Sequence, residues 1–301
     1  MALLFHSRFH YLHGSGKSAS GVCVRSSSPG MRRVTVMRTE IDSQSFLVWN
    51  SSGGLAAEEN DRGMVVADSW LVQDGRVRSY EMHWDRFSNS VGPQGVDRAE
   101  LAEFRAAVTA RLPRRGAWFP RVELLAGPSP RLALRLRPAP ALRDTARVWV
   151  ADEADPRTRP TVKGPDFGAQ GRLRKRARAH EADEALLVDG DGHAVEGAFS
   201  SLLWWDGGDL CTARDDGRIL PGITRRLLLD HAARLGVTVR HTRVSPARLA
   251  RCEVWITSAL HGIRVVTGWA PGDAPAARAA LGAAGPWQAH LDSLLTPLPP
   301  G

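Results

Sequence analysis

Short apolar runs separated by polar turns dominate the first half of the sequence. These runs are typical of β-strands, and they lie at 46–49, 64–68, 70–72, 122–125, 132–136 and 148–150. The pair Asp74-Gly75 predicts a hairpin turn that leads into a further strand at 76–80. Asp97 precedes apolar residues at helical spacing, which predicts a helix over 97–112.

The second half mixes strands and helices without a regular strand–helix–strand rhythm. Strands are predicted at 185–188, 194–196, 202–205 and 254–256. Helices are predicted at about 170–181 and at 224–235, the latter closed by Gly236. The whole pattern predicts a mixed α/β protein with two domains.

The most polar stretch within this pattern is 151–160, which contains acids, arginines and two prolines. It predicts a linker at 152–160, between an N-terminal α/β domain at 41–151 and a C-terminal domain at 161–301. The first acidic residue is Glu40, and the residues before it are rich in Ser, Arg, Gly and His. We expect residues 1–40 to be poorly ordered, either as a targeting segment or as an over-long start.

The formal net charge is +8, from 40 Lys+Arg against 32 Asp+Glu. A basic balance of this kind suits either nucleic acid or an anionic small substrate. The candidate nucleic-acid segment is 172–178, which we interpret instead as the solvated face of a helix. No run approaches the roughly 18 apolar residues that a membrane-spanning helix needs. We therefore predict no nucleic-acid partner and no membrane association.

Metal binding is not predicted. The three cysteines, Cys23, Cys211 and Cys252, are far apart and show no zinc-ligand spacing, which favours a reduced, cytoplasmic setting. The stretch 189–192, Asp-Gly-Asp-Gly, lacks the further ligands of a calcium loop and is interpreted as a hairpin turn.

Five short motifs follow one another in the second half. They are Val162-Lys163-Gly164-Pro165-Asp166, Asp183-Glu184-Ala185-Leu186-Leu187-Val188-Asp189, Val195-Glu196-Gly197-Ala198-Phe199-Ser200-Ser201-Leu202, Ile219-Leu220-Pro221-Gly222-Ile223-Thr224-Arg225, and Thr257-Ser258-Ala259 with Gly262-Ile263. Upstream, His83 stands before Asp85-Arg86-Phe87. Over roughly residues 64–268 this order and spacing resemble the class IV aminotransferase family, which includes branched-chain and D-amino acid aminotransferases and aminodeoxychorismate lyases.

The resemblance implies a fold and a cofactor. The implied fold is that of type IV pyridoxal 5'-phosphate (PLP) enzymes, with a smaller N-terminal α/β domain and a larger C-terminal α/β pseudo-barrel. Lys163 would hold PLP as a Schiff base and act as the general base, and Glu196 would stabilise the protonated pyridine nitrogen. The other implied cofactor-binding residues are Arg86, Ser200, Ser201, Ile223, Thr224, Thr257, Ser258 and Ala259.

Several positions depart from the family pattern. Ser201 stands where an asparagine is usual, and Phe167 replaces an arginine often seen in the lyases. The short segment 164–167 looks more like the lyase and D-amino acid branches than the branched-chain enzymes. Because of the breadth of the family, we predict an aminotransferase, with an aminodeoxychorismate lyase that releases pyruvate and gives 4-aminobenzoate as the alternative. A non-catalytic PLP-binding homologue is the second alternative.

The resemblance also implies a homodimer. Two loops of the first domain, around 49–60 and 80–95, are expected to shape a pocket for a small amino or keto acid.

Overall fold

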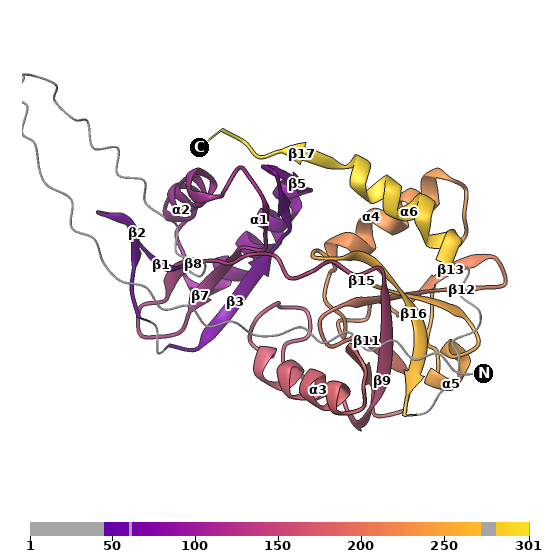
Figure 1. Ribbon diagram of the computed structural model, residues 1–301. Helices are drawn as coiled ribbons and strands as arrows, with labels where there is room; N and C mark the ends of the chain where they lie inside the picture. Colours follow the sequence, from indigo (N-terminus) through magenta and orange to yellow (C-terminus); the bar gives the residue numbers. More distant parts are fainter. Residues whose placement is uncertain (1–44, 60–61, 272–280, 301) are drawn as a thin grey trace, which may run out of the picture. The chain divides into compact units, whose positions relative to one another are not determined.

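The N-terminal half of the chain contains an antiparallel sheet of five strands in the order β2-β1-β8-β7-β3 (Figure 1). The computed structural model describes residues 45–59, 62–271 and 281–300. The strands of this sheet are β1 (Ser45–Asn50), β2 (Gly54–Ala57), β3 (Met64–Ser69), β7 (Arg121–Leu125) and β8 (Arg131–Leu136). A second sheet has the order β17-β5-β4-β6, formed by β4 (Val72–Gln73), β5 (Arg76–Arg78), β6 (Ala117–Trp118) and β17 (Leu295–Pro297).

The predicted hairpin turn between β4 and β5 is present. Asp74 and Gly75 both have positive φ, 46° and 71°, as a tight hairpin of this type requires. The predicted helix after Asp97 is also confirmed as α2 (Arg98–Arg111), where the Asp97 side chain accepts hydrogen bonds from the Ala99 and Glu100 backbone N–H groups.

The helix α1 (Tyr80–Val91) corrects the sequence prediction, which treated 76–80 as strand and 80–95 as loop. Its buried residues Tyr80, Trp84, Phe87 and Val91 recur at helical spacing and pack into the core of this half. The helix start was missed because Ser79 makes no side-chain cap and has a left-handed φ of 50°. A short 3-10 turn, Gly92–Gln94, follows α1.

The C-terminal half is built on one mixed sheet of eight strands in the order β11-β10-β9-β16-β15-β12-β13-β14. Its strands are β9 (Thr145–Ala154), β10 (Glu184–Val188), β11 (Ala194–Gly197), β12 (Ser201–Asp206), β13 (Asp209–Thr212), β14 (Val239–His241), β15 (Glu253–Ser258) and β16 (Gly262–Ala270). The sequence prediction missed β13, β14 and the nine-residue β16.

This sheet must curl, because a three-residue turn, 198–200, joins β11 at one end of the strand order to β12 five places away. At about 4.8 Å per strand, a flat sheet would separate the two strands by roughly 24 Å. The turn can span at most about 14 Å. Curling closes this distance, and Gly197 N–H donates to Ser200 O at 2.8 Å. The observed fold is thus the predicted mixed α/β type.

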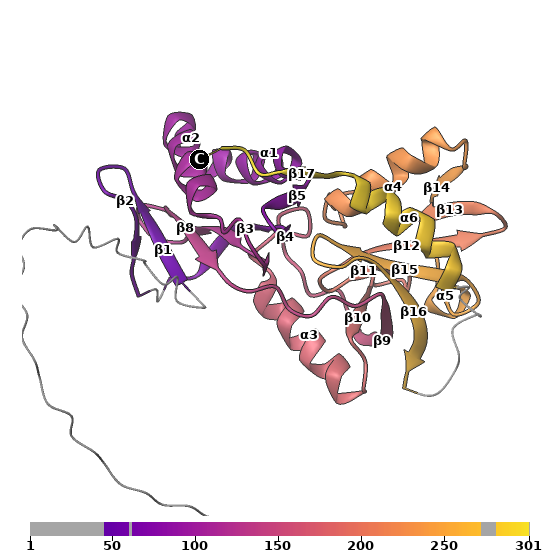
Figure 2. The same ribbon diagram turned by 45° about the horizontal axis from the view of Figure 1, so that its top comes forward.

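Helices cover the large sheet. The helix α3 (Phe167–Ala179) packs against β9 and β10, and α4 (Ile223–Arg234) packs against β15 and β12 (Figures 1 and 2). The last helix, α6 (Leu281–Ser293), packs against β16, and a single helical turn forms α5 (Pro246–Leu249). No helix in the described part of the chain is long and apolar enough to cross a lipid bilayer.

All the described residues belong to one compact unit, Ile41–Gly301. The strand β9 runs to Ala154, three residues into the segment suggested as a linker. The limits of the two-domain division remain a prediction, and the expectation for residues 1–40 lies outside the described residues.

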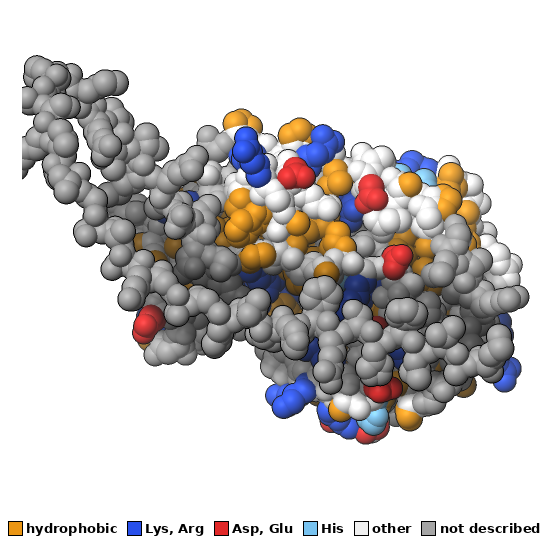
Figure 3. Space-filling view, viewed as in Figure 1, with side chains coloured by type: hydrophobic (Ala, Val, Ile, Leu, Met, Phe, Trp, Pro, Cys, Tyr) orange, Lys and Arg blue, Asp and Glu red, His pale blue; other side chains and the backbone are white. Residues whose placement is uncertain are grey.

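Basic and acidic side chains are interspersed on the face visible in Figure 3.

Candidate active site

One cavity, of about 740 Å³, is lined by residues from both halves of the chain. Its wall includes every residue that the motifs predicted for the site: Arg86, Lys163, Glu196, Ser200, Ser201, Ile223, Thr224, Thr257, Ser258 and Ala259. The curled sheet explains this convergence, because it brings the end of β11, the start of β12 and the end of β15 to one side. In particular, Ser201 and Thr257 are directly opposed in the β12–β15 register.

Lys163 lies in the connection between β9 and α3, and this connection is fastened to the N-terminal half. The backbone N–H of Ala67 donates to the Lys163 carbonyl at 2.7 Å. Gly164, with φ +126°, lies against β3 so closely that a Cβ would come within 2.8 Å of Ala67 N and 3.0 Å of Val66 C. Only glycine allows this approach, so Gly164 fixes where Lys163 stands.

We expect Gly164→Ala to destabilise the fold by at least about 1–3 kcal/mol, because the new Cβ meets backbone atoms and the φ value is essentially restricted to glycine. Urea unfolding measures the loss. Gly171→Ala is the matched control: it lies inside α3 with nothing within 4 Å of the added Cβ. It should stabilise the protein by about 0.5–1 kcal/mol. Equal effects of the two variants would contradict the assigned packing.

The side chain of Lys163 lines the cavity. Burial lowers the pKa of Lys163 to about 8, and the positive charge of Arg86 acts in the same direction. The charges of Arg137 and Arg121 also lower it, whereas the carboxylate of Asp68 opposes the shift. A substantial fraction of the amine is therefore neutral near physiological pH, as a nucleophile or a proton acceptor requires.

Glu196, the third residue of β11, is buried with 4% of its surface exposed. Its Oε1 accepts hydrogen bonds from Arg157 Nη1 and, at 3.0 Å, from Leu220 N–H. Burial raises the pKa of Glu196 to about 7, although the Arg157 charge opposes the shift. Its Oε2 has no hydrogen-bond partner among the described residues, so a donor in the cavity can reach an unused oxygen.

Arg157 belongs to the site but was missed in the sequence, where it stands in a polar stretch interpreted as linker. Its guanidinium also pairs with Asp155, with Nη2 at 2.7 Å from Oδ2, and donates to Arg218 O. The side chain is 2% exposed. No local pattern could reveal this role, because Arg157 and Glu196 are 39 residues apart.

The N-terminus of α4 forms a second polar region of the cavity wall. Gly222 is its N-cap and offers no side-chain acceptor, and the first two helical residues, Ile223 and Thr224, both line the cavity. A Cβ on Gly222 would come within 2.3 Å of Ser201 Oγ, so this helix start lies tightly against β12. Uncapped N–H groups at a helix N-terminus favour a bound anion.

Arg86 connects α1 with the approach to α4. Its Nε and Nη2 donate to the two carboxylate oxygens of Asp68 at 2.8 and 2.9 Å, and its Nη1 donates to Pro221 O at 3.0 Å. Asp68 is fully buried and also contacts His83 Nδ1 at 2.8 Å. Burial raises the Asp68 pKa, but Arg86 and His83 outweigh it and hold that pKa well below its usual range. Two guanidinium N–H groups of Arg86 stay available to a ligand.

Ser200 faces a different partner from its neighbour Ser201. Its Oγ donates to Oε2 of the buried Glu184 at 3.1 Å, and Arg264 Nη2 lies 3.5 Å from the same oxygen. Burial raises the Glu184 pKa against the opposing charge of Arg264. In the β15–β16 turn, Ser258 Oγ accepts from His261 N–H at 3.2 Å. These contacts hold the turns that line the cavity.

The prediction that loops 49–60 and 80–95 shape the pocket is correct only for the second segment. No described residue of 49–59 lines the cavity, and the second segment contributes His83 and Arg86 from a helix. The N-terminal half also contributes residues at strand ends or in the connections between strands, namely Ser69, Phe119, Arg121, Arg137, Pro140, Ala141 and Arg143. Single arginines in an arginine-rich chain carry no motif, so the sequence could not single them out.

The Asp-Gly-Asp-Gly stretch is confirmed as the turn between β10 and β11. Asp189, Asp191 and His193 have ligand atoms within 4.8 Å of one another. Asp189 Oδ1 accepts from the backbone N–H groups of Asp191 and His193, and Oδ2 from Arg218. The turn itself explains why these side chains gather.

Comparison with known proteins agrees with this geometry. The family model for class IV aminotransferases matches residues 65–269. A branched-chain amino acid aminotransferase from Escherichia coli is 18% identical, with a TM-score of 0.67 over 83% of this chain and 92% of that one. A fold IV transaminase from Curtobacterium pusillum is 19% identical, with a TM-score of 0.63 over 82% of this chain and 98% of that one.

A curated relative is similar over a shorter stretch. The aminodeoxychorismate lyase of Bacillus subtilis is 31% identical over 78 residues, which are 26% of this chain and 27% of that protein. The matched part thus spans about a quarter of this relative. The solved structures share the fold, and the family model covers more than half of the sequence. The chain therefore belongs to the class IV aminotransferase family of enzymes.

Proposed function

We propose that the protein is a PLP-dependent aminotransferase that moves an amino group between an amino acid and a keto acid. The observation that carries this proposal is the content of one cavity. A lysine whose pKa is lowered to about 8 shares it with a buried glutamate that has one unused oxygen. The N-terminus of α4, which has no side-chain cap, lines the same cavity. An amine, a carboxylate and an anion site together suit a phosphorylated pyridine aldehyde.

The residues present fit PLP in the chemistry of their donors. Lys163 would hold the cofactor covalently, and Glu196 Oε2 would accept a hydrogen bond from the protonated pyridine nitrogen. The backbone N–H groups of Ile223 and Thr224, with Arg86, would bind the phosphate. When bound, PLP supplies an electron sink for the bonds at the substrate carbon that carries the amine.

The chain's own residues then hold and move protons. When Lys163 Nζ is not bonded to the cofactor, it takes the proton from the substrate carbon that carries the amine and returns it to an adjacent atom. Its pKa near 8 lets Nζ both accept and release this proton. Arg157 and the Leu220 N–H orient the Glu196 carboxylate. Burial of Glu196 keeps water from weakening the charge interaction it makes.

An aminodeoxychorismate lyase is the second candidate. Its support is the 31% identity to the Bacillus subtilis lyase over 78 residues. The identity to the Escherichia coli aminotransferase is 18%, over 83% of this chain. Phe167, where many lyases have arginine, does not favour this candidate. Both reactions begin with the same proton removal by Lys163.

The test is an absorbance spectrum of the purified protein with PLP, followed by borohydride reduction and peptide mapping. We expect a visible absorbance band and a reduced pyridoxyl group on Lys163. Assays with amino acid donors and with aminodeoxychorismate then separate the candidates, because only the lyase releases pyruvate from the latter. A protein that stays colourless with added PLP would contradict both and favour a non-catalytic homologue.

Two further features complete the proposal. The family resemblance supports a homodimer, and light scattering of the purified protein tests it. A cytoplasmic location is supported by the free thiols of Cys211 and Cys252, which are both buried.

A further inference from the structure

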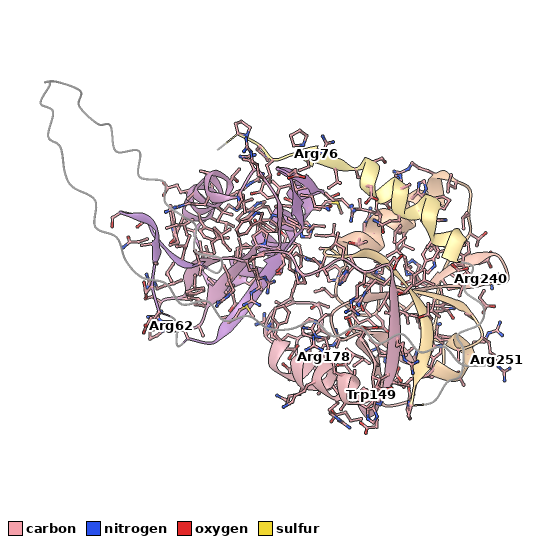
Figure 4. The ribbon with its side chains drawn as sticks, in the orientation of Figure 1. Arg62, Arg76, Trp149, Arg178, Arg240 and Arg251 are labelled. Carbon is pink, nitrogen blue, oxygen red and sulfur yellow. The ribbon has the colours of Figure 1, made fainter. Side chains whose placement is uncertain are left out.

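Arginines line the cavity from several elements, and they differ in what holds them. Arg174 and Arg178 come from α3, which corrects the prediction that the whole of 172–178 is a solvated helix face. Figure 4 labels Arg178 on this helix. Arg86 on α1 is held differently, because two of its nitrogens bond the carboxylate of Asp68, which is 0% exposed. This buried carboxylate takes no part in the proposed proton transfer, although it contacts the cavity wall.

The carboxylate of Asp68 bonds only groups of the protein. Its Oδ2 accepts from Arg86 Nε at 2.8 Å, and its Oδ1 accepts from Arg86 Nη2 at 2.9 Å and from the Ser69 N–H at 2.7 Å. His83 Nδ1 lies 2.8 Å from the same Oδ1, and the ionised carboxylate makes Nδ1 the donor. Asp68 does not line the cavity, whereas Arg86 and His83 do. Asp68 can therefore affect a ligand through these two side chains.

The contact with Asp68 fixes the direction of the Arg86 guanidinium. Two parallel N–H···O bonds hold its plane against the carboxylate, which restricts rotation of the side chain. Nη1 then reaches Pro221 O at 3.0 Å, immediately before the N-cap of α4. The Arg86 side chain is 12% exposed, so water competes little for these contacts. Within the described part of the chain, Asp68 is the carboxylate that pairs with Arg86.

One short stretch of β3 holds both ends of the site. The Ala67 N–H donates to Lys163 O at 2.7 Å, and the next residue, Asp68, holds Arg86. Gly164 lies against the same stretch of backbone. Because β3 is paired with β7 along its length, these two residues have a fixed spacing. The strand therefore sets the distance between the backbone of Lys163 and the guanidinium of Arg86.

The charge of Asp68 also acts on the amine of Lys163. Burial lowers the pKa of Lys163 to about 8, the carboxylate of Asp68 opposes this shift, and the charge of Arg86 adds to it. Burial likewise lowers the pKa of His83, so this imidazole is neutral at that pH. The charged groups that act on Lys163 come from β3, α1, β7 and the segment after β8, namely Asp68, Arg86, Arg121 and Arg137. Asp68 and Arg86 thus oppose each other at the amine.

Resting on the proposed function, we infer that Asp68 is a positioning residue, which holds Arg86 in place for the cofactor phosphate and ties it to the strand that holds Lys163. Asp68 itself touches neither cofactor nor substrate. Its loss should weaken binding of the phosphate and leave the aldehyde reaction of Lys163 possible. It should also change the protonation of Lys163 in the direction opposite to loss of Arg86.

The first test compares PLP with pyridoxal, which has the same aldehyde but no phosphate, by titrating the visible absorbance band of the full-length protein. Asp68→Asn keeps the shape of the side chain and removes its charge. It should weaken PLP about 10- to 100-fold, as expected for lost charge-assisted hydrogen bonds, and change pyridoxal binding by less than about 3-fold. A tighter PLP complex would mean that Asp68 competes with the phosphate for Arg86, which overturns the inference.

Glu123→Gln is the matched control for this comparison. Glu123 lies on β7, is 1% exposed, pairs with Arg121 and Arg135, and does not line the cavity. The variant therefore also removes a buried carboxylate that pairs with arginine in the same sheet. It should keep the wild-type ratio of PLP to pyridoxal affinity. An equal loss of PLP affinity in this control would contradict a specific role for Asp68.

The second test measures the pH midpoint of Lys163 by competitive acetylation with acetic anhydride and mass spectrometry, in full-length protein freed of cofactor. The wild-type midpoint should lie near 8. Asp68→Asn should lower it, because a carboxylate that raises the pKa is lost, and Arg86→Gln should raise it. The double variant should return toward wild type. A role in folding alone would not give shifts of opposite sign, so equal or absent shifts would count against the inference.

The double variant Asp68→Asn/Arg86→Gln also keeps the test possible if Asp68→Asn folds poorly. It removes both members of the pair, so it leaves no unpaired guanidinium at this place. If Asp68 acts through Arg86, the double variant should bind PLP as weakly as Arg86→Gln alone. A further loss of about 10-fold would show that Asp68 acts by another route and would overturn the inference.

The proposed function and this inference fail in different ways. If wild type gives no band with PLP or pyridoxal, the function is rejected. Calorimetry with inorganic phosphate then tests the inference: binding by wild type that Asp68→Asn loses would support it, and no binding by wild type would overturn it. If wild type binds PLP and Asp68→Asn keeps both the wild-type affinity and the wild-type midpoint, the function stands and the inference is rejected.

Discussion

Replacing Lys163 by alanine is expected to remove covalent PLP binding and to lower turnover by at least about 10²- to 10⁴-fold, the usual contribution of a general base. Lys163 is the lysine in the cavity wall, whose other strongly basic groups are arginines that stay protonated. No neighbouring side chain can therefore replace Lys163 as the nucleophile. The measurement is the visible absorbance band before and after borohydride, together with single-turnover rates.

The pH dependence of cofactor uptake tests the same residue without relying on turnover. Only the neutral amine attacks an aldehyde, and the lowered pKa of about 8 enlarges the neutral fraction at neutral pH. The uptake rate should therefore rise with pH and level off above about 8. A rate that keeps rising toward the ordinary lysine value of 10.5 would show that the amine is not buried as described.

Lys175→Ala is the matched control for both experiments. Lys175 lies on α3 and does not line the cavity. It should load PLP and turn over as wild type does. Wild-type turnover by Lys163→Ala, or loss of the band in the control, would contradict the assignment.

The sequence predicted the motif residues that line the cavity better than it predicted the rest of the wall. Lys163, Glu196 and the start of α4 stand in motifs whose residues are close in the chain, and all of them line the cavity. Arg157, Arg137 and Arg174 reach the cavity through the curl of a sheet and the approach of a helix. Such contacts depend on tertiary structure and leave no local periodicity.

The fold shows the same division. Short apolar runs bounded by polar turns, such as β1, β3 and β7, were predicted at close to their observed limits. The helix α1 was missed because its start has no capping side chain, even though Trp84 and Phe87 pack into the core. The strand β16 was missed although Ile263, Val265 and Val266 are residues that favour a strand. Only its pairing with the distant β9 depends on tertiary structure.

Replacing Glu196 by glutamine should leave PLP bound and lower kcat by about 10²- to 10³-fold, a loss typical of removing one preorganised electrostatic partner. Glutamine keeps the shape and the acceptor for the Leu220 N–H, but it has no negative charge to stabilise a protonated pyridine nitrogen. Borohydride labelling of Lys163 measures retention of the cofactor, and kcat measures the loss of its electron-sink function.

The variant Asp155→Asn tests whether the lower kcat comes from the lost charge of Glu196 itself or only from the loss of an acid beside Arg157. Asp155 pairs with the same guanidinium but does not line the cavity. If the charge facing the cavity matters, Asp155→Asn should lower kcat by less than about 10-fold, because Arg157 still holds Glu196. Equal losses in the two variants would mean that Glu196 acts by positioning Arg157. If Glu196→Gln lowers kcat only slightly, the pyridine nitrogen lies elsewhere in the cavity.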